Sequence, residues 1–462
     1  MQQRHSSRDC KTLLTVSCAV LLFLTILPHS YAAEKQGDMA VAEDWPMLGG
    51  GSLREFHTNY DLTPPLQLKW KYKPGGAPDA FPISSSPAVY GKLVFAGGKD
   101  GVLRALSVDD GKEVWTFRTN GAIRSSPTIV NRKVYVGSED SHVYALDAST
   151  GKLVWQFKTG DMVWSSAAIS QGILYIGSND DYLYALETSA GSLKWKFKTG
   201  HWVVSSPIVA SDKLYFGSDD GYLYALNPDT GELVWRTFME NKIWSSPAYS
   251  EGRIYIASHS WYIYSVDGET GAIIWRHPAE YYIKSSVAVF NGIVYSGSTD
   301  AKIYALNASN GRLLWNFLTV SGINSNTPVV TGEVVYATSM DGYLYALDSH
   351  SGGLLWKYNA GALISSSPAV SGRTIYIRSG DDTVHALTNQ LVQPRETVKA
   401  PPEAAKSVLQ LPEPARSKAP IAGTGPNDLS TDLQRWLPLF AGIIVATLIV
   451  GASAIRLKRV KR

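Results

Sequence analysis

The sequence predicts an all-β protein whose main domain is an eight-bladed propeller with four-stranded blades. Three landmarks predict it: a Ser-Ser-Pro segment, a Leu-Tyr-Ala-Leu segment and a tryptophan, each recurring eight times in identical or degenerate form. Five consecutive tryptophan spacings between Trp115 and Trp315 are 40 residues (155 − 115, and so on to 315 − 275). A period near 40 residues is typical of propellers and helical arrays.

The apolar pattern inside one repeat favours strands over helices. Short runs rich in β-branched and aromatic residues alternate with clusters of Gly, Asn, Asp and Ser, and no run is long enough for a pair of helices. In the second repeat these runs are 128–130, 134–136, 143–146 and 153–157. Four strands per repeat is the content of one propeller blade.

The chain begins with the pattern of a secretory signal peptide over residues 1–32. Three basic residues precede an apolar stretch at 13–27 and a small-residue segment that ends at Ala32, so we expect cleavage after Ala32 or Ala33. An uncleaved anchor is the alternative. Both cysteines, Cys10 and Cys18, lie in this segment, which leaves the mature chain without a disulfide or thiol nucleophile.

The propeller is predicted to span residues 66–389, after a lead-in at 33–65. Trp70 precedes the first Ser-Ser-Pro segment, whereas no tryptophan strand follows Leu387, so a strand at 66–72 should complete the last blade and remove the open sheet edge. We expect the eight recurrent tryptophans to be structural and to pack between neighbouring blades. They are Trp70, Trp115, Trp155, Trp195, Trp235, Trp275, Trp315 and Trp356.

The C-terminal region predicts a membrane anchor. Residues 390–435 are rich in Pro and Ala, as in disordered linkers. Residues 436–455 carry no charge over 20 positions, enough for a transmembrane helix, with a buried soluble helix as the alternative. Five basic residues in the tail at 456–462 favour a cytoplasmic C-terminus. The propeller is therefore expected outside the cytoplasmic membrane, on a single-pass protein of the cell membrane.

Charge argues against a nucleic-acid partner. The formal charge of +3 includes +2 from residues 1–32 and +5 from the tail, which leaves −4 for residues 33–455 (3 − 2 − 5). A mildly acidic domain binds the phosphate backbone poorly.

Two segments resemble a known family. Residues 145–155, Ala-Leu-Asp-Ala-Ser-Thr-Gly-Lys-Leu-Val-Trp, resemble the tryptophan-docking repeat of pyrroloquinoline quinone (PQQ) enzymes, and Asp-Trp-Pro-Met at 44–47 resembles the lead-in of PQQ-like repeat proteins. The resemblance covers residues 44 to about 388. It implies an eight-bladed propeller. Similar propellers divide into quinoprotein dehydrogenases and non-catalytic relatives such as BamB, and the fold alone does not choose between them.

The dehydrogenase branch implies PQQ with calcium, a disulfide of adjacent cysteines, acidic and Asn ligands, and a catalytic Asp. The mature chain has no cysteine, and its histidines show no metal-ligand or catalytic motif. Its recurrent acids occupy Ser-x-Asp turns, where Asp is favoured for local hydrogen bonds, so we expect them to be structural. They are Asp100, Asp140, Asp180, Asp220, Asp300, Asp341 and Asp381. We expect no catalytic residue, metal site or cofactor, with PQQ and calcium as the alternative.

A candidate binding face appears when the repeats are compared. Four residues before the proline of each Ser-Ser-Pro segment the residue is apolar and β-branched, whereas the next residue varies. Neighbours on a strand face opposite sides, so the constant residue should be in the core and the variable one at the central mouth. With the preceding loops, this predicts a face formed by Arg124, Asp161, Trp164, His201, Trp202, Asn241, Lys242, Trp244, Tyr281, Tyr282 and Lys284.

Aromatic residues mixed with Arg and Lys are typical of protein-interaction hot spots. We therefore expect a non-catalytic scaffold that binds a protein partner in the cell envelope, a role in envelope protein assembly being implied by the BamB resemblance. Three alternatives stay open. The rings could only fill the channel mouth, the protein could be a PQQ-dependent oxidoreductase, or it could be a receptor for a carbohydrate or cell-wall ligand.

Overall fold

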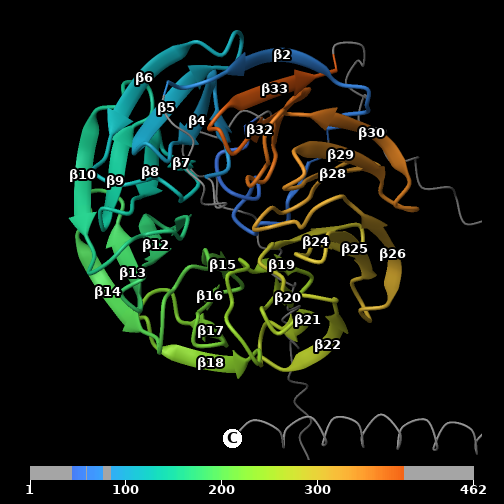
Figure 1. Cartoon of the computed structure of the whole chain (residues 1–462). Coiled ribbons are helices and arrows are strands. Elements are labelled where there is room, and N and C mark those ends of the chain that lie inside the picture. Colours follow the sequence, from blue (N-terminus) through green and yellow to red (C-terminus); the bar gives the residue numbers. More distant parts are fainter. Residues whose placement is uncertain (1–43, 59, 76–84, 390–462) are drawn as a thin grey trace, which may run out of the picture. The chain divides into compact units, whose positions relative to one another are not determined.

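The computed structural model describes residues 44–58, 60–75 and 85–389. In these ranges eight sheets surround one axis, with β6, β10, β14, β18, β22, β26, β30 and β2 on the outer rim (Figure 1). The predicted all-β, eight-bladed propeller is confirmed. The same ranges contain no helix that could span a membrane. The predicted signal peptide, linker, transmembrane helix and basic tail lie outside the described residues.

Each blade is an antiparallel sheet of four strands that run from the axis outward. Blades 1 to 4 contain β3 (Ala88–Tyr90), β4 (Leu93–Gly97), β5 (Val102–Ser107), β6 (Glu113–Arg118); β7 (Thr128–Val130), β8 (Lys133–Gly137), β9 (His142–Asp147), β10 (Leu153–Lys158); β11 (Ala168–Ser170), β12 (Ile173–Gly177), β13 (Tyr182–Glu187), β14 (Leu193–Lys198); β15 (Ile208–Ala210), β16 (Lys213–Gly217), β17 (Tyr222–Leu226), β18 (Leu233–Phe238). Blades 5 to 8 contain β19 (Ala248–Ser250), β20 (Arg253–Ala257), β21 (Tyr262–Asp267), β22 (Ile273–Pro278); β23 (Val287–Phe290), β24 (Ile293–Gly297), β25 (Lys302–Asn307), β26 (Leu313–Leu318); β27 (Val329–Thr331), β28 (Val334–Thr338), β29 (Tyr343–Asp348), β30 (Leu354–Asn359); β31 (Ala369–Ser371), β32 (Thr374–Arg378), β33 (Val384–Thr388) and β2 (Gln67–Tyr72).

The N-terminal strand closes the ring, as predicted. β2 pairs antiparallel with β33, and Trp70 lies opposite Ala386. The lead-in adds one more short strand, β1 (His57–Thr58), which pairs in parallel with β27 of blade 7. The first and last parts of the propeller are therefore held in one sheet.

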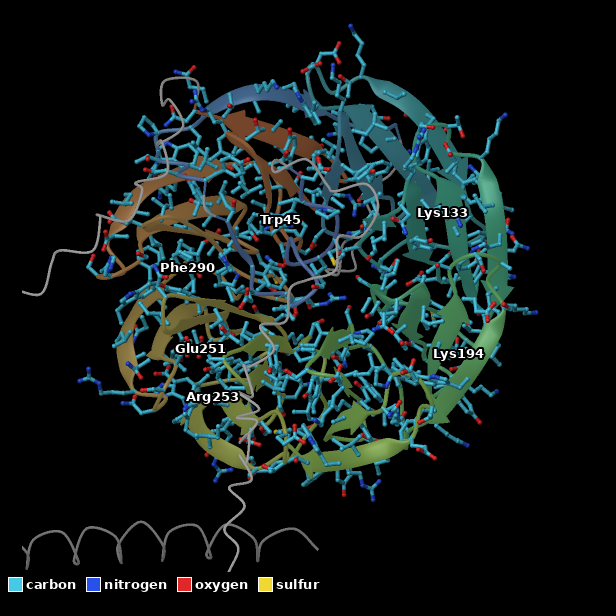
Figure 2. All side chains as sticks on the ribbon, turned by 180° about the vertical axis from the view of Figure 1, so that it is seen from behind. Trp45, Lys133, Lys194, Glu251, Arg253 and Phe290 are labelled. Atoms are coloured by element: carbon cyan, nitrogen blue, oxygen red, sulfur yellow. The ribbon has the colours of Figure 1, made fainter. Side chains whose placement is uncertain are left out.

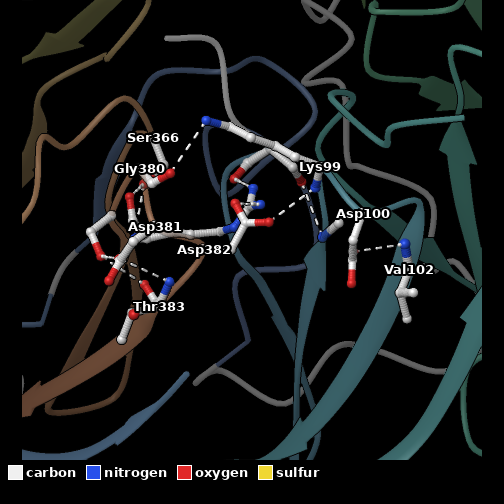
Figure 3. A network of polar contacts seen from close by, with 12 residues as sticks. Lys99, Asp100, Val102, Ser366, Gly380, Asp381, Asp382 and Thr383 are labelled. Carbon is white, nitrogen blue, oxygen red and sulfur yellow. Dashed lines mark hydrogen bonds and ion pairs between the residues drawn. The ribbon is translucent and has the colours of Figure 1, made fainter. Parts of the chain in front are cut away.

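Polar contacts between blades 8 and 1 reinforce this closure (Figure 3). The Lys99 backbone N–H donates to Asp382 Oδ2 at 3.1 Å, and Lys99 Nζ donates to the Gly380 carbonyl at 3.4 Å. Arg378 is 1% exposed, forms an ion pair with Asp382, and donates to the Ser85 carbonyl. A buried guanidinium is stable only when it is paired, so Asp382 holds both Arg378 and blade 1.

A tryptophan joins seven of the eight blades to the next. The Trp115 indole N–H donates to the Ala148 carbonyl at 3.0 Å, and its ring lies against Gly151 of the following repeat. Gly151 has a φ of +69°, and a Cβ added there would lie 2.5 Å from Trp115 Cε3. Only glycine fits both the left-handed backbone and the approach of the ring. The structural role predicted for the tryptophans is visible for seven of the eight, whose rings each lie on a glycine of the next repeat.

Six further tryptophans repeat this contact. The indole N–H groups of Trp70, Trp155, Trp195, Trp235, Trp275 and Trp315 donate to carbonyls of the next blade at 2.9–3.3 Å. Trp356 is half-buried and stacks on Tyr358, with ring centroids 6.2 Å apart.

The Ser-Ser-Pro segments form a belt of hydrogen bonds around the channel. The backbone N–H of the second serine donates to the side chain of the equivalent serine in the next blade, as from Ser126 to Ser166 at 2.8 Å. The same contact joins Ser367 of blade 8 to Ser86 of blade 1 at 3.0 Å. The first serine instead links strands within its own blade, since Ser125 Oγ accepts from the Gly137 backbone at 2.7 Å.

The recurrent acidic turns are structural in the described residues. Asp140 accepts hydrogen bonds from the His142 backbone at 3.1 Å, the Tyr144 hydroxyl at 2.8 Å and the Asn120 backbone at 2.8 Å. Because Asn120 follows the outer strand of the preceding blade, this carboxylate also joins two blades. The tyrosine contact recurs at Asp180, Asp220, Asp300 and Asp341.

We predict that Gly151→Ala lowers the free energy of unfolding by about 2 kcal/mol more than Gly252→Ala. Both glycines have positive φ, but a Cβ at Gly252 meets no atom within 4 Å, whereas one at Gly151 displaces the Trp115 ring. Gly252→Ala should therefore cost only the left-handed backbone penalty, about 1 kcal/mol. Urea unfolding monitored by tryptophan fluorescence measures both values. Equal losses would show that the ring contact does not hold the blades together.

Candidate binding face at the mouth of the channel

The residues of the predicted face lie where the inner strands begin. The constant apolar residues before each Ser-Ser-Pro segment are fully buried, as Val163 and Ile243 illustrate. The following residue points to the other side, so Trp164 and Trp244 stand at the mouth and are half-buried. The Ser-x-Asp turns lie on the same face. The backbone N–H of Asp219, in one such turn, donates to the Trp202 carbonyl at 2.8 Å.

Seven aromatic side chains on blades 3 to 6 form one continuous series of ring contacts, which we call the aromatic ridge. Neighbouring ring centroids in the series are 4.1–6.4 Å apart, and the Trp164–Trp202 and Trp164–Trp244 contacts are edge-to-face. In order, the ridge consists of Trp202, Trp164, Trp244, His259, Tyr282, Tyr281 and Trp261. Aromatic pairs at these separations attract one another, so the ridge is a preformed surface.

Some rings of the ridge are half-buried and fill the mouth of the channel, whereas others are exposed. Trp164 and Trp244 touch each other across blade 4, which has Val204 at the equivalent position, and they fill that part of the mouth. At the other end Tyr281 is 43% exposed and Trp261 is 46% exposed. Filling the mouth therefore accounts for the half-buried rings and leaves the two exposed rings unexplained.

Comparing the eight repeats of the sequence with one another did not identify Trp261 as part of this face. It occupies the turn position after the recurrent acid, where the other blades have Gly, Ser, Asp or Ala and every residue has a positive φ. Trp261 has a φ of +73° and stacks on Tyr281 with an interplanar angle of 25°. A bulky residue in this backbone region costs free energy. The sequence signal was available, since this repeat alone has a large side chain at that position.

Two ion pairs flank the ridge. Arg124 Nε lies 2.5 Å from Glu139 Oε1, and the Trp164 indole N–H donates to the same oxygen at 3.1 Å. Arg124 also lies 6.0 Å from the Trp164 ring centroid, a cation–π distance. Glu139 thus orients both predicted residues, although it was not itself predicted.

The second pair lies beneath Trp202. Lys242 Nζ lies 3.2 Å from Asp219 Oδ2, and His201 Nδ1 lies 4.0 Å from the same atom. Burial raises the pKa of Asp219, and the nearby Lys242 opposes this shift. A third cation, Lys284, lies 4.8 Å from the Trp244 ring centroid, and burial lowers its pKa.

Two of the predicted residues accept hydrogen bonds from the backbone of their own loops. Asp161 Oδ1 accepts from the Met162 backbone at 2.7 Å, and Asn241 Oδ1 accepts from the Lys242 backbone at 2.8 Å. The structure therefore brings nine of the eleven predicted residues into the ridge or its flanking charges and places Asp161 and Asn241 beside them as loop residues.

Beneath the ridge lie buried polar atoms that have no hydrogen-bond partner among the described residues. They are both amide atoms of Asn179 and His259 Nε2. The Trp244 side chain interacts with the Asp219 carboxylate and lowers its pKa against the effect of burial. Buried polar atoms in folded proteins are nearly always satisfied, so Asn179 and His259 have unused hydrogen-bonding capacity. Asn179, Asp219 and His259 all occupy the variable position after the Ser of the turn, which is followed by Asp180, Asp220 and Ser260, respectively. That position varies in every repeat, which is the signal that could have identified them.

The described residues contain no group of three or more His, Cys, Asp or Glu side chains that could hold a metal ion. The recurrent acids, which the dehydrogenase resemblance would use as ligands, are committed to backbone and tyrosine hydrogen bonds, as at Asp180 and Asp220.

His259 should titrate far below an ordinary histidine. Burial, and then the charges of Lys284 and Lys242, lower its pKa from 6.5 to about 4. The unfolded chain takes up this proton near pH 6.5, so the stability from neutral His259 is present above pH 6.5 and is lost as the pH falls toward 4. His385 has a similarly lowered pKa of about 4 and adds to the same window.

The free energy of unfolding should fall between pH 7.5 and pH 4.5. We therefore predict that this fall is smaller by about 2 kcal/mol in His259→Gln than in the native protein. Urea unfolding at the two pH values measures this difference, and histidine NMR should give a midpoint near 4 for His259. A midpoint near 6.5 would contradict the buried, uncharged state.

Comparison with known proteins supports the architecture. The family model described as outer membrane protein assembly factor BamB matches residues 64–169, 157–242, 219–326 and 319–407. No curated protein sequence matches the chain. Among solved structures, BamB from Moraxella catarrhalis is 19% identical with a TM-score of 0.61, and the match covers 70% of this chain and 100% of that protein.

Quinoprotein enzymes are similar in fold to the same extent. Quinohemoprotein alcohol dehydrogenase from Comamonas testosteroni is 17% identical with a TM-score of 0.66, covering 75% of this chain and 80% of the enzyme. A europium-containing methanol dehydrogenase is 13% identical with a TM-score of 0.64, covering 76% of this chain and 98% of the enzyme. These identities establish the fold alone. The family matches span most of the propeller, and the chain therefore belongs to the PQQ-like propeller family described as outer membrane protein assembly factor BamB.

Proposed function

We propose that this propeller is a non-catalytic scaffold that binds a segment of a partner protein on its aromatic ridge. The observation that carries the proposal is one continuous series of rings that joins the exposed Trp261, through Tyr281 and Tyr282, to His259, whose buried Nε2 has no hydrogen-bond partner among the described residues. A polypeptide can cover the rings and also supply a hydrogen bond to that atom. Side chains that only filled the mouth would require neither feature.

The charges around the ridge suit a protein partner. Arg124 and Glu139 flank one end, and Lys242, Asp219 and Lys284 line the middle. Aromatic rings next to cationic side chains are typical of interaction hot spots. In such hot spots a few aromatic and Arg residues carry most of the binding energy.

The sequence segments on either side of the propeller, together with the family, support a proposal for where in the cell the protein acts. We propose that the signal peptide exports the protein and that the helix at 436–455 holds it in the cytoplasmic membrane, with the propeller on the outer side. The family description supports a role in the assembly of envelope proteins.

Trp261→Gly should weaken partner binding without destabilising the fold. Glycine occupies the equivalent position in blades 1, 4 and 7, as Gly101, Gly221 and Gly342, so the substitution relieves the left-handed backbone while it removes the exposed ring. We expect at least a tenfold loss of affinity, about 1.4 kcal/mol, in a pull-down of envelope partners quantified by mass spectrometry, with an unchanged or raised melting temperature.

Leu355→Ala is the matched control, because Leu355 is 50% exposed on the outer strand of blade 7. It should leave capture unchanged. If Trp261→Gly and the double variant Trp202→Ala with Tyr282→Ala both captured every partner as well as the native protein does, the ridge would not be the binding surface. A clear rise in melting temperature with PQQ and calcium at about 100 times Kd, equivalent to about 2.7 kcal/mol, would instead support the oxidoreductase alternative.

Deletion of residues 436–462 should move the protein from the membrane fraction to the soluble extracytoplasmic fraction. The 20 uncharged residues at 436–455 supply the apolar length that anchoring requires. Cell fractionation with immunoblotting measures the distribution. Retention of the deleted protein in the membrane would contradict the C-terminal anchor and point to the uncleaved N-terminal segment.

A further inference from the structure

The face opposite the ridge is covered by the lead-in. In Figure 2, which views the propeller from behind, Trp45 lies closer to the centre of the ring than Lys133 or Lys194. Residues 45–57 cross this face and contact the innermost strands near the turns that join each of them to its second strand. The Val89 backbone N–H, for example, donates to the Trp45 carbonyl at 2.8 Å.

The lead-in accepts a hydrogen bond from the equivalent backbone N–H group of the innermost strand in five blades. The middle residue of the innermost strand donates its backbone N–H to a lead-in carbonyl at 2.7–3.2 Å. These donors are Val89, Ile129, Tyr249, Val289 and Val330, in blades 1, 2, 5, 6 and 7.

Blades 3, 4 and 8 lack this contact in the described residues, and blades 3 and 4 are neighbours. Ile169 of β11 and Val209 of β15 occupy the equivalent positions, and neither backbone N–H has a lead-in partner in the described ranges. Here the lead-in instead makes tight turns, with hydrogen bonds from Gly50 to Met47 and from Arg54 to Gly51. The neighbouring inner strands β11 and β15 therefore both keep an open edge at the position that the lead-in fills in five other blades.

A cavity of about 900 Å³ lies at this gap. Its lining is mixed: apolar side chains such as Met47, Ile169 and Val209 lie beside polar ones such as Gln171 and Asn227. A space of this size takes several residues of an extended chain or a small ligand.

Arg54 also lines the cavity and is 1% exposed. Its Nη2 donates to the Ser166 and Ala167 carbonyls at 3.3 and 3.4 Å, whereas its Nη1 is buried without a partner in the described part of the chain. Burial lowers the pKa of Arg54 to about 9, so it remains charged at neutral pH. The acids that line the cavity belong to its turns: Asp229 lies 3.3 Å from Lys194, and Asp212 lies on the turn after β15.

We propose that this cavity binds an extended peptide segment of a partner protein, which adds to the open edges of β11 and β15 and places a carboxylate on Arg54. The lead-in itself shows that an extended chain fits this position, since it makes the same main-chain bond in five other blades. Strand addition draws affinity from main-chain hydrogen bonds. A buried guanidinium with a free N–H group selects a carboxylate, its preferred planar partner.

The test uses the full-length protein in the cells that produce it, with a photo-crosslinking amino acid at Ser211, beside the cavity. We expect the crosslinked peptide, mapped by mass spectrometry, to come from another protein and to carry Asp, Glu or a C-terminal carboxylate. Arg54→Met should lower the crosslink yield about tenfold, since a hydrogen bond to a charged group contributes roughly 1.5–3 kcal/mol. Arg54→Lys, which keeps the charge, should lower it less.

Two controls keep the result interpretable. Arg54→Met should keep or raise the melting temperature, because it removes a buried charge without an ion-pair partner, and this shows that the variant folds. Trp261→Gly should leave the crosslink unchanged, which separates this site from the ridge. A crosslink to residues 1–43 of the same chain, a peptide without a carboxylate, or a yield that Arg54→Met does not change would each overturn the proposal.

Discussion

Seven of the eight blades of this propeller are each held to the next by a tryptophan ring that lies on a glycine, and the rest of the molecule depends on that contact. The indole N–H bond to a neighbouring carbonyl fixes the position of the ring, and the positive φ of the glycine leaves room for it, as between Trp115 and Gly151. Since every link joins equivalent positions of successive repeats, the chain must keep a period near 40 residues. Trp70 makes the same contact with Gly111, so the closing strand is docked like any other outer strand.

Because these contacts hold the outer strands together, the residues near the central axis can differ from blade to blade. The serine belt and the acidic turns use backbone groups and a few constant side chains, and they allow two positions in each blade to vary in sequence. Trp164, Trp244 and His259 occupy these positions, and at the mouth they join loop residues such as Trp202 and Tyr282 in the aromatic ridge. Trp261 goes further, because it occupies a backbone conformation that costs stability and that three other blades assign to glycine. A side chain kept at such a cost is most simply explained by what it contacts outside the fold.

The two faces of the ring share one physical feature. On each, a polar atom is removed from water without a hydrogen-bond partner in the described chain: His259 Nε2 below the ridge, and Arg54 Nη1 in the lead-in cavity. Such groups lower stability until something binds them, so they favour the bound state of the protein. The same propeller can therefore present two binding surfaces that differ in chemistry, one aromatic and one formed by strand edges with a buried cation.

The sequence alone determined the number of blades, the strands in each and the closure by Trp70, because these follow from a period and from local strand and turn patterns. It also indicated most of the ridge, since a strand places alternate residues on opposite sides. It missed Glu139, Asp219, His259 and Trp261, whose roles depend on turns of different blades meeting at the axis. Nor could it show that the lead-in skips blades 3 and 4 and buries Arg54 there, because the path of an irregular segment is set by tertiary contacts that have no period.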